Sequence, residues 1–155
     1  MTPKQFEEQF MKLKDTYVFT FDDGLKEHFT VAFPLLKQYG LTGYFFPIGE
    51  TLEGTFNHVH KAHILLDMFE EEFIELYKAN GCYFDDESQL DVKYFYDSPK
   101  IARFKKYLTT ASAEYKNLVF DRILEYNKIS LPKTEDYYLT KNELKQMSDA
   151  GMVFG

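Results

Sequence analysis

The stretch that decides the fold is residues 18–49, VFTFDDGLKEHFTVAFPLLKQYGLTGYFFPIG. It begins within a short run of aromatic and β-branched residues, Tyr17–Phe21, which is typical of a strand buried on both faces. A second aromatic run, Thr42–Pro47, predicts another strand. The stretch therefore contains two candidate strands, separated by a segment long enough to hold a helix.

The segment between the two strands predicts that helix. Thr30 is expected to be its N-cap, Pro34 is tolerated only near the first turn, and Gly40 supplies the C-terminal stop. Strand, helix and strand in close succession form a βαβ unit, in which the two strands are parallel and the crossover is right-handed. We therefore expect an α/β fold for the N-terminal part of the chain.

Helical patterns dominate the rest of the sequence. The segment T-P-K-Q, beginning at Thr2, has the form of a capping box, and Thr140 with Glu143 forms a second one before a short strand at 152–154. Apolar residues at helical spacing predict a long helix over 57–80 that ends at Gly81, and two more helices over 101–108 and 112–127. We find no internal repeat or linker, and interpret residues 1–155 as a single, incomplete domain.

Composition limits the classes of partner. The chain has 155 residues, of which 45% are apolar, so it can bury a real core. Its 18 basic and 25 acidic residues give a formal charge of -7, which argues against a surface for nucleic acid or for an anionic membrane. We therefore expect no nucleic-acid partner and no membrane partner.

The sequence also favours a reducing compartment. Cys82 is the single cysteine, so the chain has no internal disulfide and no site built from several thiolates. The first ten residues, MTPKQFEEQF, lack the apolar core of a signal peptide, and no run approaches the roughly 18 apolar residues of a membrane span. We expect a cytoplasmic location.

Asp22, Asp23 and Gly24 place two adjacent carboxylates where the first predicted strand ends, at the edge of an α/β sheet where catalytic groups collect. Because neighbours alternate in direction along a strand, the two aspartates can have different roles, one toward a cation and one toward a reacting proton. In isolation, the tripeptide is better explained as a simple turn, since Asp and Gly are the usual turn formers.

The surrounding residues favour the functional interpretation. The T-F-D-D-G core at 20–24, and the K-Q-Y-G that ends the helix before an aromatic strand, resemble the first motif region of the polysaccharide deacetylase family, carbohydrate esterase family four. This resemblance implies a distorted (β/α) barrel that removes acetyl groups from an acetylated sugar or polysaccharide. It also implies that Asp22 is the catalytic base and that Asp23 binds a divalent metal, zinc being the expected ion.

The resemblance covers roughly the first half of the family domain. The family's second motif, a pair of metal-binding histidines, is absent, although residues 142–155 are similar to the segment that precedes it. The pair is expected just past Gly155, and a helical insertion is expected from about Thr51 to Asp136. We therefore predict little or no activity for this form. The alternative is a non-catalytic remnant that binds a sugar or another chain and self-associates through exposed strand edges.

Four histidines remain to be interpreted. His58, His60 and His63 lie close together and offer a rival metal site, but their spacing differs from the family pair and they follow the second predicted strand. Short histidine clusters are weak evidence without carboxylate or thiolate partners, and we interpret these histidines as polar surface or capping groups near a helix start. His28 is interpreted as a solvated loop residue near the site entrance.

Overall fold

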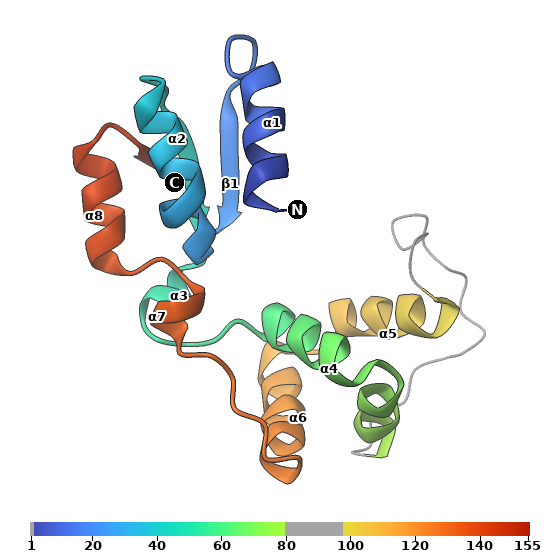
Figure 1. Ribbon diagram of the computed structural model, residues 1–155. Coiled ribbons are helices and arrows are strands. Elements are labelled where there is room, and N and C mark those ends of the chain that lie inside the picture. Colours follow the sequence, from blue (N-terminus) through green and yellow to red (C-terminus); the bar gives the residue numbers. More distant parts are fainter. Residues whose placement is uncertain (1, 80–97) are drawn as a thin grey trace. The chain divides into compact units, whose positions relative to one another are not determined.

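The computed structural model describes residues 2–79 and 98–155 (Figure 1). The chain divides into two compact units, one formed by Met1–Phe56 with Pro132–Gly155 and the other by Asn57–Leu131. The second unit falls inside the range expected for the helical insertion. Gly81, which is predicted to end the long helix, and the single cysteine, Cys82, lie outside the described residues.

The first unit is built on a parallel sheet with the strand order β1-β2-β3. The strands are β1 (Phe19–Asp23), β2 (Gly43–Pro47) and β3 (Val153–Phe154). The predicted βαβ unit is therefore confirmed, since β1 and β2 pair in parallel and a helical segment connects them. Closure of such a sheet into a distorted barrel stays a prediction.

A helix precedes each strand of this unit, and helices also follow β1 and β2. They are α1 (Pro3–Leu13), the π-helix η1 (His28–Ala32), α2 (Phe33–Gln38), α3 (Gly49–Leu52), α7 (Thr134–Tyr137) and α8 (Lys141–Asp149). Both predicted capping boxes are confirmed, the one of Thr2 at the start of α1 and the one of Thr140 at the start of α8. The short helices α3 and α7 carry no strong sequence pattern and were not predicted.

The described helices cover one face of the sheet and leave the other open. Side chains from α1, α2 and α8 pack with the strands in one apolar core that includes Phe10, Phe33, Leu36, Phe45, Met147 and Met152. On the opposite face, the exposed residues are Thr20, Asp22, Tyr44, Phe46 and Val153. The prediction that the first strand is buried on both faces is wrong, because the described helices cover only one side of β1.

The connection between β1 and β2 also differs from the prediction. Thr30 does not cap a helix; it lies inside the π-helix η1, and its hydroxyl donates to the Lys26 carbonyl at 3.3 Å. Pro34 explains the wider turn, since a proline ring clashes with the carbonyl four residues earlier in a regular α-helix. The Phe33 N–H instead donates to the His28 carbonyl, which gives the five-residue spacing of a π-turn.

The second unit is helical. It contains α4 (His58–Ala79), α5 (Pro99–Thr110) and α6 (Ala113–Tyr126), and the three helices predicted for this part of the chain are confirmed. Ser112 caps α6 by accepting from the Tyr115 N–H at 3.2 Å. The core of the unit includes Leu65, Ile74, Phe104, Val119, Phe120 and Ile123. None of the helices in the described part of the chain has the length and apolar character needed to cross a membrane.

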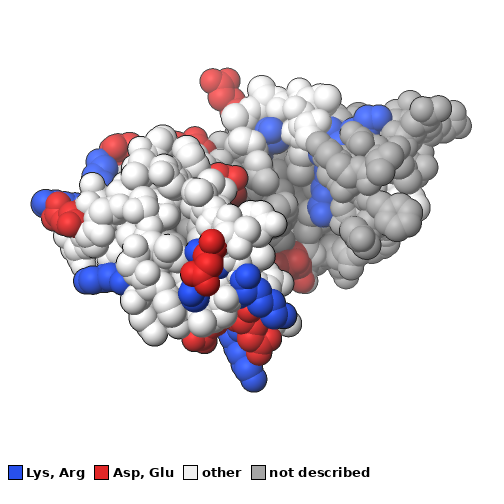
Figure 2. Space-filling model, turned by 90° about the horizontal axis from the view of Figure 1, so that it is seen from above, with Lys and Arg blue, Asp and Glu red and all other residues white. Residues whose placement is uncertain are grey.

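Charges of both signs are mixed on the surface. In the view of Figure 2, Lys and Arg lie beside Asp and Glu and do not gather into one basic stripe among the residues drawn in colour. The exposed pair Lys145 and Asp149 on α8, with 2.9 Å between Nζ and Oδ2, is one example of such neighbours. Exposed pairs of this kind add little to stability, typically less than about 1 kcal/mol.

Candidate active site

The two aspartates lie at the carboxyl end of β1 and turn to different sides of the sheet. In the register of the sheet, Asp22 is opposite Phe46 and Asp23 is opposite Pro47. Asp22 is exposed on the open face, whereas Asp23 is half-buried on the side of the helices. The strand therefore presents one carboxylate to solvent at the edge where active sites of parallel α/β proteins form.

A tight left-handed turn follows the two carboxylates. Asp23 has a φ of 71° and Gly24 a φ of 69°, a region that aspartate tolerates better than most residues and that glycine adopts freely. A Cβ on Gly24 would lie 2.7 Å from the Cβ of Pro47, closer than real atoms approach. Glycine is thus required here twice, by the backbone angle and by the close approach to the end of β2.

The segment before α8 holds this turn in place. The Leu139 N–H donates to the Gly24 carbonyl at 2.8 Å, and Leu25 forms an antiparallel bridge with Tyr138. Tyr138 and Leu139 are 1% and 2% exposed, so the anchor is part of the core and not a surface loop. The position of the carboxylates therefore depends on residues more than a hundred positions away in the sequence.

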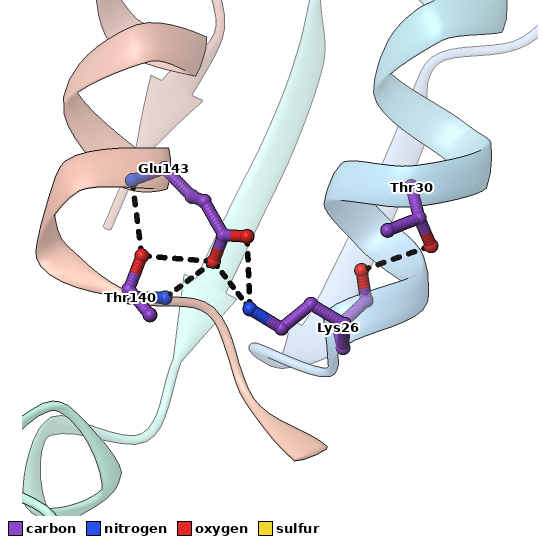
Figure 3. Close-up of polar contacts among 4 residues, drawn as sticks. All are labelled: Lys26, Thr30, Thr140 and Glu143. Carbon is purple, nitrogen blue, oxygen red and sulfur yellow. Dashed lines mark hydrogen bonds and ion pairs between the residues drawn. The ribbon is translucent and has the colours of Figure 1, made fainter. Parts of the chain in front are cut away.

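An ion pair adds a second connection between the turn and α8 (Figure 3). The Lys26 Nζ donates to both carboxylate oxygens of Glu143, at 2.8 and 2.7 Å. The Glu143 Oε2 also accepts from the N–H and the hydroxyl of Thr140, at 2.7 and 2.9 Å, within the capping box of α8. The Glu143 carboxylate thus takes part in the cap of α8 and also binds Lys26, two residues after Gly24.

The electrostatics of Glu143 agree with this role. Burial alone would raise the pKa of Glu143, but the hydrogen bonds from Lys26 and Thr140 and the charge of Lys26 outweigh it, and the net pKa is lowered from 4.5. The carboxylate is therefore ionised across the neutral pH range, and the contact with Lys26 is a true ion pair.

His28 lies behind the two aspartates, on the covered side of the sheet. Its ring is 5.4 Å from that of Phe21 and 6.0 Å from that of Phe45, between centroids. Burial lowers the pKa of His28 from 6.5, and the charges of Glu27, Asp23 and Asp22 oppose that shift without cancelling it. The prediction of a solvated loop histidine is wrong, because η1 turns the ring into the aromatic layer, where Nδ1 is buried without a hydrogen-bond partner among the described residues.

Comparison with protein families identifies the chain. The model of the family described as polysaccharide deacetylase matches residues 11–155. The chain belongs to the polysaccharide deacetylase family. The match begins within α1 and includes the whole sheet, the turn at Asp22 and Asp23 and the segment that anchors it. Searches among curated proteins and among solved structures found no match.

The family resemblance implies a divalent metal, and the described part of this deacetylase-family chain does not supply a complete site for one. Within residues 2–79 and 98–155, no three His, Cys, Asp or Glu side chains come together closely enough to hold an ion. Catalytic zinc is usually held by three protein ligands, and Asp23 could provide one. The residues at hand therefore do not fit a full metal centre.

The histidines of the second unit do not form a metal cluster either. The rings of His60 and His63 are 6.4 Å apart between centroids, and His60 is only 7% exposed. With no group of three potential ligands among the described residues, the rival metal site receives no support. His58 and His63 instead line a cavity between helices of that unit.

Sequence reasoning misjudged two residues that shape the site of this deacetylase-family chain, Glu143 and His28. Glu143 was recognised only as a capping residue, and no pattern links it to Lys26 across 117 positions. His28 was placed in solvent. The one available signal was Pro34, which predicts an irregular turn four residues earlier and hence a changed orientation for the side chains of η1.

Proposed function

We propose that this chain removes an acetyl group from an acetylated carbohydrate by hydrolysis, with Asp22 as the general base. Membership of the polysaccharide deacetylase family indicates a hydrolase of the carbohydrate esterase type and a carbohydrate substrate. The observation that supports a role for Asp22 is its position, exposed on the open face of the sheet at the carboxyl end of β1. A carboxylate there can reach both solvent and a sugar.

The proposed chemistry is a balanced acyl transfer to water. A water oxygen bonds to the acetyl carbonyl carbon while Asp22 takes a proton from that water. The bond from the carbonyl carbon to the sugar nitrogen or oxygen then breaks, and the leaving atom receives the proton that Asp22 took from the water as acetate departs. Removing the proton during attack is needed because neutral water is a weak nucleophile.

We further propose that Asp23 is one ligand of a divalent metal, with zinc the expected ion. When bound, such an ion would supply Lewis-acid chemistry, which lowers the pKa of water toward about 7. The other ligands are not among the described residues. The proposal for Asp22 therefore depends on its placement and on the family, and the proposal for Asp23 on the motif alone.

The test of this function is acetate release from a panel of N-acetylated and O-acetylated oligosaccharides, with and without added zinc, by a form of the chain extended to include the family's histidine pair. Asp22→Asn keeps the size and the hydrogen-bonding shape of the side chain and should abolish release. Asp23→Asn is preferable to alanine, because asparagine tolerates the left-handed backbone at this position. The Asp23→Asn variant should lose the metal, whereas the Asp22→Asn variant should keep it. Asp149→Asn, on the surface of α8, is the matched control and should behave as wild type.

A second candidate is a non-catalytic interaction module. It is favoured by the open face of the sheet, where Tyr44, Phe46 and Val153 are 37%, 43% and 44% exposed, and by β1 and β3, which are edge strands. We propose that the chain self-associates through this face. Analytical ultracentrifugation of wild type and Phe46→Lys tests it: a shift toward monomer in the variant supports association, and identical profiles reject it.

A further inference from the structure

A cavity of about 290 Å³ lies within the second unit, among residues of α4, α5 and α6. Its apolar lining includes Ala62, Leu66 and Leu108. The volume is close to the lower limit of ordinary small-molecule sites, roughly 300 Å³. The cavity is therefore large enough for a small ring or a short alkyl chain.

A lysine whose side chain is largely buried borders this apolar lining. Lys116 is only 7% exposed, and its Nζ donates to the Leu108 carbonyl at 2.8 Å, the one hydrogen bond it makes among the described residues. An ammonium has three donors, so two remain. Burial lowers the pKa of Lys116, which is the expected effect of removing a charge from water without an opposite charge beside it.

The other polar residues of the lining are also basic residues or hydrogen-bond donors. They are His58 and His63 from the first turns of α4, Lys105 from α5 and Thr109 near the end of α5. None of the described lining residues carries a carboxylate. The amino end of α4 adds the partial positive charge of the helix dipole. The cavity thus combines an apolar wall with positive charge and hydrogen-bond donors.

Another lysine of the unit shows the contrast. Lys61, on the same helix as the two histidines, pairs with Asp121 at 2.8 Å and does not line the cavity. Lys116 is likewise largely buried, but its Nζ donates to the backbone carbonyl of Leu108 and not to a carboxylate. An anion entering the cavity would compensate the desolvation of that ammonium.

We propose that this cavity binds a small organic carboxylate, with its apolar body against Ala62, Leu66 and Leu108 and its carboxylate toward Lys116 and Lys105. The cavity is lined by residues of the second unit alone, and its proposed role does not depend on deacetylase activity. It lies in the range expected for the helical insertion, so it gives that insertion a role in ligand binding.

The experiment uses benzoate as the probe and benzamide as its neutral analogue of nearly equal shape. Each is titrated into the isotope-labelled full chain, and amide shifts of residues 58–66 and 105–116 are followed by NMR. Benzoate should move these shifts with saturation, and benzamide should bind about tenfold more weakly or worse, since hydrogen bonds to charged groups are the stronger ones. Equal binding of the two, or no saturable benzoate shift in these segments, would overturn the proposal.

Two lysine variants and a control separate a specific site from general charge. Lys116→Met and Lys105→Met should each weaken benzoate binding about tenfold. Lys133→Met removes the same charge from an exposed position in the other unit and should change nothing. Circular dichroism shows which variants remain folded, and Lys105→Met keeps the test decisive should Lys116→Met unfold. Equal weakening in the control, or shifts produced by inorganic phosphate but not benzoate, would refute a carboxylate site.

Discussion

The ion pair between Lys26 and Glu143 connects the loop after the aspartates to α8, and its removal gives a quantitative prediction. The side chains of the two residues are only 20% and 16% exposed, so this pair differs from the surface pairs of the same helix. Two substitutions separate its functions. Glu143→Gln keeps an oxygen for the capping box but loses the charge, and Glu143→Ala loses both.

The magnitude follows from the contacts. A hydrogen bond to a charged group contributes roughly 1.5–3 kcal/mol, so Glu143→Gln should cost about 2 kcal/mol. Loss of the capping interactions with Thr140 adds about 1 kcal/mol, which brings Glu143→Ala to about 3 kcal/mol. Asp149→Asn breaks an exposed pair on the same helix and should cost less than about 0.5 kcal/mol.

The pH dependence has a definite sign. The pKa of Glu143 is lowered on folding, so its contribution to stability is present above pH 4.5 and is lost as the pH falls through the lower value of the folded state. Between neutral pH and strongly acidic pH, wild type should therefore lose more stability than Glu143→Gln does.

The measurement is urea unfolding with pulse-labelling hydrogen exchange, read on the peptide that contains β2. This readout reports the first unit alone, which matters because the second unit has a core of its own. The reasoning would be refuted if Glu143→Gln and Asp149→Asn had the same urea midpoint and if Glu143→Gln lost as much stability at acidic pH as wild type does. It would mean that the pair contributes no more than a surface contact.

Two further predictions concern the turn and the histidine behind it. Gly24→Ala should destabilise the first unit by more than about 2 kcal/mol, because both the φ of 69° and the approach to Pro47 oppose a side chain. Gly40→Ala, at a φ of 64° but with open space around the new atom, should cost only about 1 kcal/mol in the same urea assay. For His28, whose folded pKa lies below 6.5, wild type should lose stability as the pH falls from 6.5 through that lower value. His28→Phe should lack this phase in a pH series of unfolding midpoints, and the same slope in both proteins would contradict the assignment.

Local signals in the sequence predicted most of the elements. The capping boxes of Thr2 and Thr140 depend on side chains within one turn of the helix, so the sequence contains all the information that sets them. The same holds for Gly40 and Gly151, whose positive φ angles follow the ends of α2 and α8. Such features need no knowledge of the tertiary structure.

The errors occurred where a distant contact or a local conflict decides the structure. β1 is buried on one face because the described helices pack on that face alone. The aromatic run of this strand does not alternate clearly between apolar and polar residues, so the sequence did not reveal which face is exposed. The π-helix forms because the ring of Pro34 would clash with the carbonyl of Thr30 in a regular α-helix, and the wider turn changes the orientation of His28. For the site, the aspartates were found through the motif, whereas the contacts that fix their turn come from Tyr138, Leu139 and Glu143, far along the chain.

Acetate release by wild type and by Asp22→Asn, measured side by side on an acetylated oligosaccharide, tests the central claim most directly. In a form of the chain extended to include the family's histidine pair, the proposed role of Asp22 predicts measurable release without the substitution and at least a hundredfold less with it, the loss typical of removing a general base, about 10²–10⁴. Equal release by both folded proteins would contradict it, because the exposed carboxylate at the end of β1 would then have no part in the chemistry.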